Sequence, residues 1–269
     1  MMKYGKSVGH LKALVLPVVV ICSFEVAVCV FVALGGSSPK LVIFPAPSTV
    51  LRQASTAIRQ QAVLMATGMT LGTTLLGFSL GIVGALLTGS LLGVYRSIEE
   101  LAAPSLHFLR SLPVVIYVPM ALVLLGSDLR VPIVLSALIT TLYGAIPVAR
   151  AIRDYDIERV LFLRARGYTT PRIVGGFILP VIFGALLTSA SIAATLALSV
   201  TVVAEMLLQG FNGLGALIIR AKEQSAYALL WGLTVILGCC GFAFHSLVLY
   251  LWRFAAPWVD DSQRSDAGG

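Results

Sequence analysis

The ionisable side chains with a possible chemical role are few and lie far apart. Glu25 and Arg110 fall inside long apolar runs, and Glu205 stands at the end of another. Charge inside a membrane is costly and therefore suggests a function. Glu25 would need a partner or a water-filled surface, whereas Arg110 lies close enough to one end of its run to extend its guanidinium toward the membrane surface. For Glu205, a structural hydrogen bond is one explanation.

No motif for catalysis or nucleotide binding accompanies these residues. The sequence lacks the complete pattern Gly-x-x-x-x-Gly-Lys-Ser/Thr; of its five lysines only Lys6, in Gly5-Lys6-Ser7, follows Gly with Ser or Thr after it, and the first Gly of the pattern is missing there. The chain therefore cannot bind ATP through a P-loop. His-Glu-x-x-His is also absent, and we interpret His245 as a packed or interfacial residue. The four cysteines lack metal-ligand spacing and are interpreted as small core residues. We expect no catalytic residue, no metal site and no cofactor on this chain.

The composition is that of a membrane protein. Of the 269 residues, 58% are hydrophobic and 12% are charged, and the mean hydropathy is +0.96; soluble domains average roughly 25% charged residues. The apolar runs are long and continuous, unlike the alternating segments of a transmembrane β-barrel. We therefore expect an all-α integral membrane protein without a soluble catalytic domain.

The net charge of +7 has a topological explanation. Basic residues concentrate in loops that stay in the cytoplasm, so the excess does not indicate a nucleic-acid partner. With the N-terminus inside, the cytoplasmic segments hold 12 Lys and Arg and the outer segments hold 6. This count predicts an N-in/C-in, multi-pass protein of the cytoplasmic (inner) membrane.

Six apolar runs are long enough to cross a bilayer. We predict a single transmembrane domain over residues 1–259 and a disordered tail over 260–269. Before the second run, Ser48 is predicted to cap a short surface helix that starts at Thr49. The predicted spans are Leu11–Leu34, Ala62–Tyr95, Pro104–Gly126, Val131–Ala149, Leu179–Ala204 and Tyr227–Trp252.

Small residues recur at helical spacing in two of these spans. Such spacing lets helices approach closely, and we interpret it as packing within the chain, with contact to a second membrane subunit as the alternative. Prolines in or near spans break helical hydrogen bonds, which suits a transport path. The small residues are Gly68, Gly72, Gly77, Gly81, Gly89 and Gly93, and Ala185, Ser189, Ala193 and Ala197; the prolines are Pro113, Pro119, Pro132 and Pro147.

The stretch from residue 150 to 180, called here the charged loop, is too polar for the membrane and too patterned for a linker. Its pattern predicts a short helix over Asp154–Arg166, a left-handed C-cap at Gly167, and a second helix that starts at Thr170-Pro171 with Thr as N-cap. The residues on one face of the first helix are Ile157, Val160 and Leu161. A short helix displayed between two spans is typical of a docking element; a solvated loop that serves topology is the alternative.

A family resemblance rests on this loop. Gly167 and nine further residues precede Phe177-x-Leu179-Pro180. This resembles the EAA loop in permease subunits of binding-protein-dependent ABC importers, where Glu-Ala-Ala, three residues, Gly and nine residues precede Ile-x-Leu-Pro. The resemblance covers residues 40–258 and is to the branch for nitrate, sulfonates, taurine and related solutes. Other matching segments are Phe44-Pro45-Ala46-Pro47-Ser48, Gly77-Phe78, Arg110, Pro113, Pro119, Gly126, Val202–Met206 and Gly213-Leu214-Gly215.

The resemblance implies the six-helix permease fold of type I ABC importers, together with its partners. Two permeases form the path, each inserting its loop helix into an ATPase subunit, and an extracytoplasmic binding protein delivers a small, often anionic solute. ATP and Mg²⁺ would bind to the separate ATPase. The implied ATPase-coupling residues are Ile157, Glu158, Leu161, Arg164, Gly167, Tyr168 and Arg172. The implied translocation path or gate contains Arg110, Pro113, Glu205 and Met206.

Two positions depart from the family pattern. Leu161-Phe162-Leu163 stands where Glu-Ala-Ala is usual, with Glu158 one turn earlier, and Thr73 replaces a residue that is commonly Arg. Losing the Glu removes a charge-assisted contact to the ATPase. Coupling is then altered, or the chain pairs with a different permease that keeps the motif, or it docks a specialised ATPase. A homodimer and a heterodimer stay equally open.

Two other functions fit parts of the sequence. An ATP-independent channel or secondary carrier would show internal repeats or a row of membrane-buried ionisable groups, and neither is evident. A non-transporting or degenerate partner in a heterodimeric complex would explain the missing acidic residue at Leu161.

Overall fold

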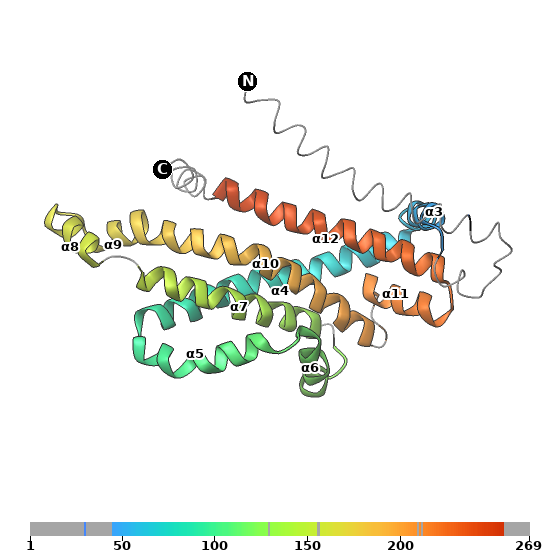
Figure 1. Ribbon diagram of the computed structural model, residues 1–269, viewed down its shortest axis with the longest axis horizontal. Helices are drawn as coiled ribbons and strands as arrows, with labels where there is room; N and C mark the ends of the chain where they lie inside the picture. Colours follow the sequence, from blue (N-terminus) through green and yellow to red (C-terminus); the bar gives the residue numbers. More distant parts are fainter. Residues whose placement is uncertain are drawn as a thin grey trace, which may run out of the picture. The chain divides into compact units, whose positions relative to one another are not determined.

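The structure, a computed structural model, describes Val30 and residues 45–128, 130–154, 157–208, 210 and 212–255. These residues form helices and turns and include no strand, as expected for an all-α protein. Apart from Val30, the predicted span Leu11–Leu34 with Glu25 lies outside the described residues, as does the predicted tail 260–269. The α-helices are α3 (Pro47–Ala57), α4 (Gln61–Val94), α5 (Arg96–Ser111), α6 (Tyr117–Leu125), α7 (Arg130–Arg153), α8 (Ile157–Ala165), α9 (Thr170–Ile173), α10 (Leu179–Leu207), α11 (Leu214–Glu223) and α12 (Tyr227–Ala255) (Figure 1).

The chain divides into two compact units, residues 1–64 with 217–238 and residues 65–216 with 239–269. In the first unit, α3 packs closely against the first half of α12. A Cβ atom added at Gly232 of α12 would lie 2.9 Å from the backbone nitrogen of Ala54 of α3. The prediction that Ser48 caps this helix was wrong. Helix α3 already begins at Pro47, with Ala46 in the N-cap position and no side-chain cap bond, and the fixed φ of proline suits a first helical turn.

In the second unit, α4 and α7 lie in direct backbone contact through glycines. A Cβ atom at Gly77 would lie 2.5 Å from Cβ of Ser136, and one at Gly81 would lie 2.4 Å from Cβ of Thr140. Gly89 and Gly93 meet α7 in the same way, whereas Gly68 and Gly72 have no neighbour within 4 Å. Packing within the chain is thus confirmed for two of the three glycine pairs.

Helix α10 packs along α7 (Figure 1), and both helices contribute many buried residues to the core. Of the four small residues predicted to form a packing face, Ser189, Ala193 and Ala197 are buried and Ala185 is partly buried. Ala193 and Ala197, together with Phe78 of α4 and Phe244 of α12, form one cluster. A second cluster joins α7 and α10 to α6. Small side chains let these apolar helices approach closely, which maximises van der Waals contact where lipid gives no hydrophobic driving force.

The predicted third span, Pro104–Gly126, is not one continuous helix. Helix α5 starts earlier, at Arg96, and includes Pro104; α5 and the following helical segment Val114–Leu125 are bent by 94° at the break between them. Leu112 adopts an extended backbone, which is the conformation that a following proline favours. The hydroxyl of Tyr117 donates a hydrogen bond to the carbonyl of Leu109 across the bend.

The predicted spans Ala62–Tyr95, Val131–Ala149 and Tyr227–Trp252 agree with helices α4, α7 and α12 to within a few residues. Four helices are long and apolar enough to cross a membrane, or up to five if the bent pair forms one span. The four are Gln61–Val94, Arg130–Arg153, Thr170–Leu207 and Tyr227–Leu251. The helix that corresponds to the predicted span Leu179–Ala204 begins before Leu179, because α9 runs into α10 through a π-helical turn over Val174–Ile178.

Candidate functional site

The charged loop contains a helix, a glycine turn and a second helix, as predicted. Helix α8 begins at Ile157 and not at Asp154, whose N–H bonds to the carbonyl of Arg150 and so continues the end of α7. Gly167 has a φ of +84°, which confirms the left-handed C-cap. Its N–H bonds to the carbonyl of Arg164, and the N–H of Tyr168 bonds to that of Leu163. This pair of bonds is the Schellman motif that satisfies the last carbonyls of a helix.

The N-cap of the second helix, after this turn, differs from the prediction by one residue. Thr169 and not Thr170 is the N-cap, and it acts through its carbonyl, which accepts the N–H groups of Arg172 and Ile173. A π-turn follows, and Pro180 comes just after it. Proline has no N–H to close an ordinary α-turn, so the wider turn accommodates it at the entry to the membrane-spanning part of α10.

The outer surface of the charged loop is apolar, aromatic and cationic. Leu161 is 59% exposed and Phe162 is 56% exposed. The guanidinium of Arg166 lies 4.5 Å from the ring centroid of Phe162, and that of Arg172 lies 5.5 Å from the ring of Tyr168. Arg164 lies in the last turn of α8, where a cation is favourable. The side chains of Ile157 and Glu158 lie outside the described residues.

The predicted path residues do not form one site. Arg110 lies in the last turn of α5, and Pro113 lies at the 94° bend. Glu205 and Met206 lie near the C-terminal end of α10. The hollow that contains Arg110 is lined by α10 residues around position 188, so Glu205 lies about 25 Å further along that helix at 1.5 Å per residue.

Glu205 is fully buried and joined to two other segments. Its Oε2 accepts hydrogen bonds from the hydroxyl of Thr70 at 2.9 Å and from the N–H of Gly215 at 3.0 Å. A Cβ atom at Gly213 would lie 2.2 Å from its carboxyl carbon. The glycines after α10 are therefore required for the carboxyl to reach the first turn of α11, where negative charge is stabilised by the helix dipole. Met206, its neighbour in sequence, is half-buried.

Arg110 lies in a small hollow between helices. Its guanidinium carbon lies 4.7 Å from the ring centroid of Tyr143. The hollow has a volume of about 170 Å³ and is lined by Arg110, Tyr143, Pro147, Ala185, Thr188, Ser189 and Ile192. No acidic residue is among them. Tyr143 was not singled out from the sequence, because a lone Tyr in an apolar run carries no signal of its own.

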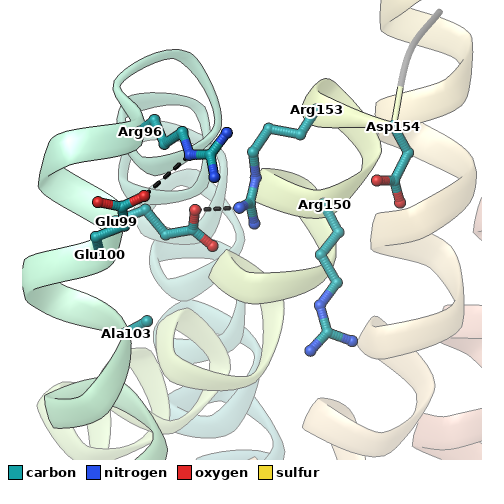
Figure 2. A pocket seen from close by; sticks show the side chains of 7 residues that line it. All are labelled: Arg96, Glu99, Glu100, Ala103, Arg150, Arg153 and Asp154. Atoms are coloured by element: carbon teal, nitrogen blue, oxygen red, sulfur yellow. Dashed lines mark hydrogen bonds and ion pairs between the residues drawn. The ribbon is translucent and has the colours of Figure 1, made fainter.

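A larger charged cavity of about 680 Å³ lies where the start of α5 meets the end of α7. Figure 2 shows Glu99 pointing across it to Arg153, with which it forms an ion pair, while Arg96 pairs with Glu100 at 2.9 Å on α5 itself. Arg150 extends from α7 without an ion-pair partner among the described residues (Figure 2). Sequence reasoning missed the cavity, although the Arg96–Glu100 spacing is a recognisable helical pair.

The known proteins that this chain resembles in sequence are permeases of transport systems. Residues 77–260 match the family model described as the inner membrane component of binding-protein-dependent transport systems. A probable ABC transporter permease of Brucella abortus is 26% identical over 81% of this chain and 87% of its own length. The putative aliphatic sulfonates transport permease SsuC of Bacillus subtilis is 26% identical over 94% of this chain and 89% of its own length. The bicarbonate transport system permease CmpB of Synechocystis is 28% identical over 70% of this chain and 67% of its own length.

The fold has a counterpart among solved structures. An inward-facing structure of the MetNI methionine ABC transporter matches with a TM-score of 0.55 and 22% sequence identity, over 74% of this chain and 95% of the matched chain. The resemblance to ABC importer permeases is therefore confirmed in both sequence and fold. The chain belongs to the family of inner membrane components of binding-protein-dependent transport systems, and it is a multi-pass permease subunit of an ABC importer.

Proposed function

We propose that this permease carries a small anion across the inner membrane and is driven by a separate ATPase that docks on the charged loop. In this proposal the chain is oriented N-in/C-in, so the charged loop meets the cytoplasm. ATP and Mg²⁺ bind to the ATPase, and the permease itself catalyses no reaction. An extracytoplasmic binding protein delivers the solute to the outer face.

The exposed apolar surface of α8 is the observation that carries the docking proposal. Leu161 and Phe162 are each more than half exposed on a short helix between two membrane-spanning helices. Exposed apolar side chains that cluster outside the bilayer mark a surface for a partner. Arg166 lies against Phe162 and adds positive charge, so the complementary surface on the ATPase is an apolar groove with an acidic rim.

The solute class is supported by two relatives. SsuC is named for aliphatic sulfonates and CmpB for bicarbonate. Both are small solutes in which one negative charge is shared by the oxygens of a single group. An anion of this kind is therefore the solute class that we propose for this chain.

A second permease completes the proposed path. The partner is either an identical copy or a different permease. A different partner that keeps the acidic residue of the EAA motif would supply the charge-assisted contact that Leu161 cannot make. The charged loop of this chain would then contribute its apolar surface to docking, and the partner would contribute the charge.

Docking is tested by co-purifying the ATPase with a permease that carries Leu161→Ser and Phe162→Ser. Burying each side chain contributes about 1.5–3 kcal/mol, so we expect ATPase recovery to fall by roughly tenfold or more with unchanged membrane insertion. The control is Val123→Ser with Leu124→Ser, an apolar pair on α6 that is 86% and 80% exposed. Equal ATPase recovery from both double variants would contradict docking on α8.

A further inference from the structure

The guanidinium of Arg110 is partly buried between helices and has no partner for its charge among the described residues. Within the described residues it forms no ion pair and no hydrogen bond, and its one recorded contact is the ring of Tyr143 at 4.7 Å. Arg110 lies about 20 Å from Arg96 along α5, at 1.5 Å per residue. Arg96 lines the charged cavity at the other end of α5, and α5 together with Val114–Leu125 is apolar enough to form one bent span, so Arg110 lies beside the bend of that span.

An arginine within a membrane span must face water or a polar group. A membrane-buried charge is costly, and such residues face bundle interiors or water-filled cavities rather than lipid. The ring of Tyr143 covers one face of the guanidinium and leaves its five N–H donors without an acceptor among the described residues. The donors are therefore available to an acceptor from outside this part of the chain.

The hollow beside Arg110 provides room for such an acceptor. Its volume of about 170 Å³ accommodates several water molecules, and thus a sulfonate or bicarbonate group. The hydroxyls of Thr188 and Ser189 line it and donate to carbonyls of their own helix, and neither oxygen accepts a hydrogen bond from Arg110. Among the described residues no carboxylate lines the hollow, in contrast to the charged cavity with its three acidic residues. The hollow consequently favours an anion over a cation.

We infer that Arg110 and the wall formed by Tyr143 and the α10 residues Thr188, Ser189 and Ile192 form an anion-binding site on the translocation path. The guanidinium presents a planar fork of donors that pairs with two oxygens of one anionic group. Tyr143 holds the fork in place by stacking. The inference rests on the proposed transport of an anion and assigns the charge of that solute to one residue of this chain.

A first experiment measures the charge of the hollow without a known solute. In the permease–ATPase complex in liposomes, with the four native cysteines replaced by Ala, Ile192→Cys introduces a thiol at the wall. We expect an anionic sulfonatoethyl methanethiosulfonate to modify this thiol several-fold faster than a cationic trimethylammonioethyl reagent, after correction for their rates with free thiol. Adding Arg110→Gln should remove the preference.

The matched control for this experiment is Ser199→Cys, an exposed position on the same helix two turns further along. It should show no preference that depends on Arg110. Absence of modification at position 192 by both reagents would show that the hollow is closed to water and overturn the site. An unchanged preference in the Arg110→Gln background would overturn it as well.

A second experiment separates this site from the proposed function. ATP-driven uptake of methanesulfonate, bicarbonate and nitrate is measured with the complete importer, including its binding protein. We expect Arg110→Gln to lower uptake of the transported anion at least tenfold and Arg110→Lys to restore part of it, with ATPase recovery unchanged.

Uptake that survives Arg110→Gln would overturn the site and leave anion transport standing. Failure of the wild-type importer to take up any of the three would overturn the proposed solute class and the site with it. An effect confined to vesicles that contain phosphatidylglycerol would assign the guanidinium to a lipid headgroup and overturn the site.

Discussion

Glu205 and Thr70 are 135 positions apart and share a hydrogen bond of 2.9 Å between two membrane-spanning helices. The Thr70 hydroxyl in turn accepts the N–H of Leu214 at 2.9 Å, and the Glu205 carboxyl accepts that of Gly215 at 3.0 Å. One buried carboxyl thus connects α4, α10 and the first turn of α11. This geometry favours a structural role for Glu205 over a role in the gate.

The two roles of Glu205 are separated by comparing Glu205→Gln with Glu205→Ala. The Gln oxygen can accept both hydrogen bonds that Oε2 accepts now, and its NH₂ would replace Oε1, which has no partner among the described residues. We expect Gln to preserve the melting temperature of the detergent-solubilised complex and its transport rate. Ala leaves a cavity and unpaired polar groups, and should destabilise by about 2–5 kcal/mol. A Gln variant with normal melting but no transport would identify Glu205 as a functional charge instead.

Glycine packing between α4 and α7 gives a second prediction. Gly81→Ala places a Cβ atom 2.4 Å from Cβ of Thr140, a distance that forces the helices apart. Overpacking of this kind costs about 1–3 kcal/mol, and we expect a lower melting temperature of the purified permease. Gly72→Ala is the control on the same helix, because no atom lies within 4 Å of its added Cβ, and it should be neutral or slightly stabilising. Equal melting temperatures for the two variants would show that α4 and α7 are not in close contact.

The sequence predicted features that depend on neighbouring residues, and it did not predict contacts between residues far apart in the chain. Gly167 was correctly expected in a left-handed conformation, since its neighbours alone define the end of a helix. The bend at Pro113 was missed, because a proline in an apolar run kinks some spans and is tolerated in others. The contact of Arg110 with Tyr143 and that of Glu99 with Arg153 depend on how α5 packs against α7. No periodicity in either helix reports that packing.

The conformation of Gly167 gives a third prediction, for coupling. At a φ of +84° a side chain is strained, at a cost of about 1–2 kcal/mol for Ala and less for Asn, which visits this region more readily. We expect Gly167→Ala to reduce ATP-driven uptake more than Gly167→Asn does, with both variants inserted normally. The measurement is uptake divided by the amount of assembled complex in proteoliposomes. A larger loss for Asn than for Ala would mean that the bulk of the side chain, and not the backbone conformation, limits coupling.

The ion pair between Glu99 and Arg153 gives the fourth prediction, because it fastens the start of α5 to the end of α7. The two side chains are partly exposed, 18% for Glu99 and 32% for Arg153, so water and salt screen the attraction and its contribution is about 1 kcal/mol or less. We expect Arg153→Gln to lower the melting temperature slightly, and this loss should be smaller at high salt. The control is Arg150→Gln, because Arg150 lines the same cavity without an ion-pair partner among the described residues. Its effect on the melting temperature should not depend on salt. A double-mutant cycle with Glu99→Gln isolates the pair. A coupling energy of zero at low salt would show that packing alone holds α5 to α7, and Arg153 would then be free to contact the ATPase beside the charged loop.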